Sequence, residues 1–281
     1  MDLSDLKAVA TQAGADVFGV ADVERFDELP DEKHPRAIFP ETKSVIVLGR
    51  RITRGTLRGV EEGTNFADYR HYGSDWLEDR FVATTTFRVS SWLEDERWEA
   101  VPLPNLPPEI PPMGVPVRKG SPAPNVMLDF DDAAVRAGLG EIGYCGVLLT
   151  PRFGPRQRVQ MILTDAEIEP TPLLSAPICP RSDECRGFCP LGAYVGESEI
   201  TICGKTMTVA EIDWRKCAVC KNGARANRSH PAGKPDRLAA VCIRSCVDTL
   251  ERTGRIEGAL RSPFRKREPW TLGEDTNLYK V

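Results

Sequence analysis

Apolar residues recur at helical spacing in three parts of the chain. The pattern predicts helices over residues 2–14, 76–93 and 131–137, and Gly14 is a stop signal for the first of them. The apolar residues expected to form the buried face of the long second helix are Phe81, Phe87, Val89 and Trp92. These helices would need a sheet or another helix to cover their apolar faces.

Short apolar runs of strand length alternate with the helical patterns. We expect strands at residues 16–20, 44–49, 100–103, 146–150 and 157–164. The run at 44–49 (SVIVLG) is continuously apolar, which is typical of a strand buried on both faces. The alternation of strands and helices predicts an α/β or α+β layer domain over residues 1–165.

The character of the chain changes after about residue 166. Cysteine, glycine, proline and polar residues dominate there, and strand signals fade. We therefore expect a second domain over residues 166–281. It contains eight of the nine cysteines of the chain, and cysteine thiolates are soft ligands that suit iron–sulfur clusters and zinc.

The cysteines follow an incomplete ferredoxin pattern. The bacterial ferredoxin run is C-x2-C-x2-C-x3-C-P, and its fourth cysteine ligates the other cluster. Cys179, Cys185 and Cys189 occupy the first, third and fourth positions of that run, and Ser182 stands at the second. In a second group, Cys242 and Cys246 match the last C-x3-C, while an alanine stands where an earlier cysteine is expected.

Two motif cysteines are missing, and Cys203 and Cys220 are additional. The total of eight is what two four-cysteine clusters require, so we predict two [4Fe–4S] clusters. The expected ligands are Cys179, Cys185, Cys203 and Cys246 for cluster A, and Cys189, Cys217, Cys220 and Cys242 for cluster B. One or two structural zinc sites are the alternative, because Cys217-Ala-Val-Cys220 has zinc-like spacing.

Two further features stand before this region. Cys145 lies apart from the other cysteines, and we expect a small buried apolar side chain, with a redox or ligand role as the alternative. Gly138, Gly140 and Gly143 match G-x-G-x-x-G, but a helix precedes them and a strand follows, the reverse of a dinucleotide site. Such glycines permit close approach of another chain segment or of a flat cofactor.

Composition narrows the classes of partner. The chain has 281 residues, a net charge of −4 and a pI near 5.6, so nothing attracts it to nucleic acid or to an anionic membrane surface. Its longest apolar runs are too short to cross a bilayer. The N-terminus has no export signal and no twin arginine, so we expect a cytoplasmic protein whose cysteines bind metal rather than form disulfides.

The segment AAVRAGLGEIGYCGVLLTPRFGPRQRVQMILTD (133–165), followed by a C-x3-C-P group, resembles the epoxyqueuosine reductase family, which is related to the catalytic core of reductive dehalogenases. Upstream, GADVFGVADVERF, FPETKSVIVLGRRI and WLEDERWEAVPLP resemble family blocks as well. The resemblance implies an α+β protein with a nitroreductase-like α/β domain followed by a ferredoxin-like double-cluster domain. It also implies a base-off cobalamin in the first domain, lined by Ala137, Gly138, Gly140 and Gly143.

The expected function is reduction of a small molecule by electrons that pass through the two clusters to a corrinoid or directly to the substrate. The alternative is a cobalamin-free electron-transfer or maturation protein, or one that uses a flavin. A ferredoxin or flavodoxin would donate the electrons, and no tRNA partner is expected, because the helical-repeat region of the tRNA enzymes does not follow the cysteines here.

A metal-driven reduction leaves the protein mainly to supply a proton and to hold the substrate. Tyr69-Arg70-His71-Tyr72 contains the best candidates, with Tyr69 or Tyr72 as the proton donor and Arg70 or His71 lowering the pKa of that tyrosine. The alternative is an exposed polar loop before the long helix. The catalytic aspartate of the tRNA enzymes has no counterpart at the matching distance, so that role is not transferred.

Overall fold

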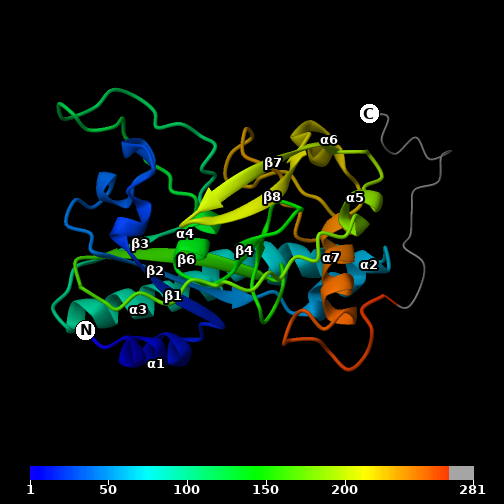
Figure 1. The fold of residues 1–281 in the computed structure, drawn as a ribbon, viewed down its shortest axis with the longest axis horizontal. Coiled ribbons are helices and arrows are strands. Elements are labelled where there is room, and N and C mark those ends of the chain that lie inside the picture. The colour runs from blue at the N-terminus through cyan, green and yellow to red at the C-terminus, as the bar shows by residue number, and fades with distance from the viewer. Residues whose placement is uncertain (266–281) are drawn as a thin grey trace. The chain divides into compact units, whose positions relative to one another are not determined.

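The computed structural model describes residues 1–265 (Figure 1), and residues 266–281 of the predicted second domain lie outside this range. The chain divides into two compact units. The first contains Met1–Arg51, Leu77–Leu139 and Arg158–Leu174; the second contains Ile52–Trp76, Gly140–Gln157 and, within the described range, residues 175–265. This differs from the single boundary expected near residue 166. The reason is that Ile52–Trp76 and Gly140–Gln157 supply partners for side chains of the cysteine-rich part.

The first unit is built on a four-stranded sheet with the order β1-β2-β6-β3. The strands are β1 (Val17–Asp22), β2 (Ser44–Arg51), β3 (Ala100–Leu103) and β6 (Gln157–Thr164). β1 pairs antiparallel with β2, and β3 pairs antiparallel with β6. The first six residues of β2 are buried, which confirms the inference from its continuous apolar run.

Helices α1 (Leu3–Ala13) and α3 (Ala83–Asp95) pack against each other, and Figure 1 shows both along one side of the sheet. Helix α4 (Phe130–Arg136) packs against β1 and β2. The predicted limits of α1 are confirmed: the Asp2 carboxylate accepts a hydrogen bond from the amide of Ser4, and Gly14 ends the helix with a φ of 105°. Short 3₁₀ turns cover Val23–Phe26, Asp31–Lys33 and Pro35–Ala37.

The long helix expected over residues 76–93 differs from the structure. Two π-helical segments, Tyr69–Asp75 and Leu77–Val82, precede α3. Val89 is buried as predicted, but Phe81 and Phe87 are exposed. A π-helical turn contains more residues than an α-helical turn, so it rotates the side chains that follow away from the face expected from a regular 3.6-residue period.

The second unit contains two two-stranded sheets and four α-helices among its described residues. The sheets are β4 (Glu141–Ile142) with β5 (Leu148–Leu149), and β7 (Tyr194–Ile202) with β8 (Lys205–Ile212). The helices are α2 (Arg58–Glu61), α5 (Glu184–Gly187), α6 (Trp214–Val219) and α7 (Val241–Arg252), and a 3₁₀ turn covers Arg54–Leu57. Helix and strand together make the protein α+β, as predicted. Every helix within residues 1–265 is too short or too polar to span a bilayer.

The β7–β8 hairpin corrects the expectation that strands end before the cysteine-rich part (Figure 1). Its turn residues Cys203 and Gly204 have φ values of 48° and 77°. Positive φ at both positions is the geometry of a type I′ turn, which suits the twist of a hairpin. The alternating polar and apolar residues on both sides of this turn are the signal that could have identified it.

Candidate functional site

Helix α7 presents two of the predicted ligands from one side. Cys242 and Cys246 are four residues apart, so they lie one above the other on the helix, and both are buried. Helix α5, which carries Cys185, packs against α7. This packing brings the two incomplete cysteine motifs of the sequence together.

Four thiols form a first group: Cys145, Cys179, Cys185 and Cys246. The thiols of Cys145 and Cys246 are in hydrogen-bond contact, which lowers the pKa of Cys145 and raises that of Cys246. The amide of Tyr144 donates to the sulfur of Cys179 at 3.4 Å. Burial raises the pKa of Cys185, and Cys145, Cys242 of the neighbouring group and Cys179 lie near enough to raise it further. The first group therefore contains Cys145, which the sequence indicated as a core residue.

A second group consists of the four cysteines expected for cluster B: Cys189, Cys217, Cys220 and Cys242. Cys217 lies on α6 and Cys220 directly follows that helix. The amide of Ala193 donates to the sulfur of Cys189 at 3.2 Å. Burial, together with the nearby Cys242 and Cys189, raises the pKa of Cys217 to about 11. In this second group, the residues that the sequence pattern paired are neighbours.

Cys203, expected in cluster A, lies elsewhere in the second unit. It stands in the turn of the β7–β8 hairpin, after the nine residues of β7. Tyr194, at the other end of β7, contacts Cys242. A strand rises about 3.3 Å per residue, so Cys203 is roughly 30 Å from Tyr194 along the hairpin. In Figure 1 the tip of the hairpin accordingly points away from α7.

Arg237 lies between the two thiol groups and is buried. Its Nη2 donates to the carbonyl of Cys145 at 2.6 Å, and its guanidinium lies 4.8 Å from the ring centre of Trp214. Burial disfavours its charge, yet Cys242, Tyr194 and Cys145 raise its pKa. Its Nη1 is buried and has no hydrogen-bond partner within residues 1–265. A buried cation with an unsatisfied donor, surrounded by thiols, indicates an anionic group at this place.

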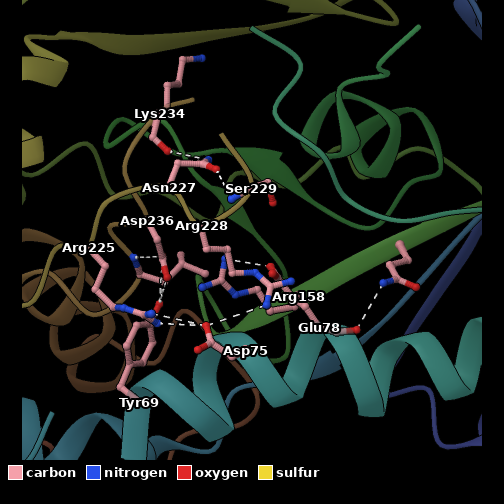
Figure 2. A network of polar contacts seen from close by, with 12 residues as sticks. Tyr69, Asp75, Glu78, Arg158, Arg225, Asn227, Arg228, Ser229, Lys234 and Asp236 are labelled. Atoms are coloured by element: carbon pink, nitrogen blue, oxygen red, sulfur yellow. Dashed lines mark hydrogen bonds and ion pairs between the residues drawn. The ribbon is translucent and has the colours of Figure 1, made fainter. Parts of the chain in front are cut away.

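The candidate proton donors lie in different environments. The Tyr69 hydroxyl donates to both carboxylate oxygens of Asp236, at 2.8 and 2.9 Å, and Tyr69 is 1% exposed (Figure 2). Tyr72 is 50% exposed and packs edge-on against Trp76. Arg70 pairs with Asp75 at 3.3 Å. The proton of Tyr69 is thus engaged by a carboxylate, and Tyr72 faces solvent.

Asp236 and Arg225 hold the loop that carries Arg237. The backbones of Arg225 and Asp236 bond to each other at 2.8 and 2.9 Å, and the Arg225 guanidinium lies 3.4 Å from Asp75 (Figure 2). Successive residues of an extended segment point to opposite sides, so Asp236 faces Tyr69 while Arg237 faces the thiols. Asp236 and Arg237 were not predicted as site residues from the sequence, because an Asp-Arg pair in a polar loop has no distinctive spacing.

Replacing Tyr69 with phenylalanine is expected to lower the free energy of unfolding by about 1–2 kcal/mol, because the half-buried Asp236 carboxylate loses a charge-assisted hydrogen bond to the buried Tyr69 hydroxyl. The control is Tyr72→Phe, whose exposed hydroxyl should matter by less than about 0.5 kcal/mol. Urea denaturation of both variants measures the difference. Equal small losses would mean that the Tyr69–Asp236 bond does not stabilise this loop.

The glycine motif packs against the protein itself. A side chain at Gly140 would collide with the carbonyl of Leu149, and one at Gly143 with the Leu149 side chain. At Gly138 it would collide with the carbonyl of Pro172, and Ala137 is fully buried. These contacts correspond to close approach of the chain's own segments, the first of the two alternatives. The order of α4 before β4 also agrees with the rejection of a dinucleotide site.

No three histidine, cysteine, aspartate or glutamate side chains within residues 1–265 converge as they would on a single ion. In a [4Fe–4S] cluster the four cysteines bind four different irons, so they surround a volume rather than a point. A tetrahedral zinc site brings four ligands to about 2.3 Å from one ion. Each of the two thiol groups has four cysteines, the number of ligands that a [4Fe–4S] cluster or a tetrahedral zinc site takes.

Comparison with known proteins gives both sequence matches and structural matches, while no family model matches the chain. Over 58 residues the chain is 47% identical to tetrachloroethene reductive dehalogenases of Desulfitobacterium hafniense and Dehalobacter restrictus. This match covers 21% of the chain but only 9% of the relatives' length.

Among solved structures, the catabolic reductive dehalogenase NpRdhA aligns with a TM-score of 0.54 and 17% identity, over 75% of this chain and 28% of its own. A reductive dehalogenase whose structure suggests a mechanism for B12-dependent dehalogenation aligns with a TM-score of 0.53 and 18% identity, over the same shares. An epoxyqueuosine reductase reaches 0.47 at 17% identity, over 84% and 70%. The chain therefore resembles the reductive dehalogenase-like superfamily that its sequence indicated, and it shares the fold of the reductive dehalogenases.

Proposed function

We propose that the protein is an iron–sulfur oxidoreductase that passes single electrons through two [4Fe–4S] clusters and reductively cleaves a bond in a small molecule. The observation that carries this proposal is the arrangement of eight thiols in two groups of four around the buried Arg237. The likeness to reductive dehalogenases supports the reductive chemistry.

The residues fit the clusters in number, chemistry and charge. Cys189, Cys217, Cys220 and Cys242 would hold one cluster; Cys179, Cys185 and Cys246 would provide three ligands of the other. Bound clusters supply one-electron transfer at low potential. The chain contributes burial, amide donors to the sulfurs of Cys179 and Cys189, and the cation of Arg237, which together stabilise the anionic clusters.

A corrinoid has weaker support from the described residues. The space beside the α-carbons of Gly138, Gly140 and Gly143, where a flat cofactor could approach the backbone, is filled by other atoms of the chain. The electrons would therefore pass to the substrate directly or to an acceptor held by other residues. A ferredoxin or flavodoxin is the proposed donor. A cobalamin-free electron-transfer or maturation role is the second candidate, favoured by the same glycine contacts.

Protein purified without oxygen is expected to contain roughly eight irons and eight sulfides per chain. Metal analysis, sulfide analysis and an absorption spectrum measure this. About one cobalt per chain would support the corrinoid form of the proposal, and iron without cobalt would support direct reduction or simple electron transfer. About four irons, or zinc in place of iron, would contradict the two-cluster proposal.

A further inference from the structure

We propose that Cys145 is the fourth ligand of the cluster held by Cys179, Cys185 and Cys246, and that Cys203 is not a ligand. This inference rests on the proposed two-cluster function. It assigns a ligand from a separate hairpin to the place that Ser182 leaves without a thiol in the motif.

The backbone around Cys145 is shaped to present its side chain. Cys145 lies between β4 and β5, in a tight turn closed by a hydrogen bond of 2.8 Å from the amide of Gly146 to the carbonyl of Gly143. Gly146 has a φ of 69°, a conformation that glycine adopts without strain. The turn buries Cys145, which is 2% exposed.

The neighbours of this turn are the other three thiols. Tyr144, the preceding residue, donates its amide to the sulfur of Cys179 at 3.4 Å. The Cys145 thiol contacts Cys246 of α7, which is also a close neighbour of Cys179 and Cys185. A buried cysteine that served only as a small apolar residue would not need to lie among the three ligands of an incomplete site.

Arg237 is an independent indication that an anion belongs here. Its Nη2 donates to the carbonyl of Cys145 at 2.6 Å, which fixes the guanidinium beside this residue. Its Nη1 is buried and has no hydrogen-bond partner among residues 1–265. Burial of an unsatisfied, charged donor is costly, and a thiolate-ligated cluster next to Cys145 would remove that cost.

Geometry excludes Cys203 from the same cluster. The hairpin turn requires Cys203 in the left-handed region, with a φ of 48°, which fixes it at the tip. The nine residues of β7 separate it from Tyr194, which contacts Cys242 one helical turn from Cys246. Where β8 passes the turn of Cys145, the amide of Ala210 donates to the carbonyl of Tyr144 at 2.8 Å, and Ala210 is seven residues from Cys203. Along the strand this separation is roughly 23 Å, which is far more than a cluster only a few ångströms across can bridge.

Iron content and electron paramagnetic resonance of three variants test the assignment. We expect Cys145→Ala to lose the signal of one reduced cluster and to retain about four of eight irons, or about seven with a three-iron signal. The matched control Cys203→Ala should keep about eight irons and both signals. Iron loss in Cys203→Ala with an unchanged Cys145→Ala variant would overturn the proposal.

The double variant Cys145→Ala/Ser182→Cys restores the motif cysteine while Cys145 is absent. We expect it to fold and to recover about eight irons, and this holds even where Cys145→Ala alone is too unstable to purify. Recovery of about eight irons in the double variant supports the assignment. If the double variant contains no more iron than Cys145→Ala, the proposal that Cys145 replaces the motif cysteine at position 182 is overturned. Wild type without iron would contradict the proposed function itself, whereas wild type with eight irons and an intact Cys145→Ala variant would contradict this assignment alone.

Discussion

Replacing Arg244 with methionine is expected to lower the free energy of unfolding by about 3–5 kcal/mol. Arg244 lies on α7 between the two cysteines of that helix, and its side chain is 1% exposed. It donates to Glu61 at 2.6 Å and to the side-chain oxygen of Asn222 at 2.9 Å. Methionine fills a similar volume but leaves the buried Glu61 carboxylate with Arg265, 3.1 Å away, as its ion-pair partner within residues 1–265.

The matched control is Arg252→Met on the same helix. Arg252 is 58% exposed and pairs with Glu184 at 2.9 Å, so its loss should cost only about 0–1 kcal/mol. Urea denaturation of the iron-loaded variants gives both values. If the two variants lost equal stability, the Arg244–Glu61 pair would not be a principal connection between α7 and the segment that contains α2.

Replacing Arg237 with methionine is expected to lower the reduction potential of the nearer cluster by on the order of 100 mV. A buried cation beside a bound cluster would stabilise the reduced, more negative state, so its removal would make reduction harder. With an effective dielectric constant of about 20 and a separation of about 8 Å, two unit charges interact by about 2 kcal/mol. That energy corresponds to on the order of 100 mV for one electron.

Lys234→Met provides the comparison for this measurement. The Lys234 ammonium lies 5.2 Å from the ring centre of Trp214, the ring that Arg237 also contacts, but the residue is exposed. Solvent screens an exposed charge, so its removal should shift the potential far less. Redox titration followed by electron paramagnetic resonance separates the two effects. Unchanged potentials in Arg237→Met would show that the guanidinium does not face a cluster.

Local signals predicted the elements of the first unit well. The carboxylate of Asp2 and the glycine at position 14 mark the ends of α1, and apolar runs mark β2 and β6. Residues within or next to each element specify it: capping residues for the helix, and a continuous run of buried apolar residues for each strand. The π-helical segments before α3 were not predictable in this way, because the same apolar residues fit a regular helix until tertiary packing selects the longer turn.

The candidate site was predictable only in part. The ferredoxin crossover predicted that Cys189 joins Cys217 and Cys220, and the short interval between Cys217 and Cys220 keeps those two on one loop. The spacing of the cysteines could not decide between Cys145 and Cys203 as the remaining ligand. Sequence distance does not show that Cys203 lies at the far end of a long hairpin, or that a short hairpin places Cys145 next to Cys179. Contacts between residues far apart in the sequence decide which cysteine completes a group, and no local sequence pattern shows these contacts.

The interleaving of the two units also has a consequence for the order of events during synthesis. Glu61 is made 183 residues before its partner Arg244. At a translation rate of about 5–20 residues per second, this glutamate waits for roughly 10–40 s before α7 exists. The nascent second unit therefore cannot close as its own segments leave the ribosome. Iron delivered before α7 is made would meet an incomplete ligand set, so cluster insertion is expected to follow the synthesis of α7.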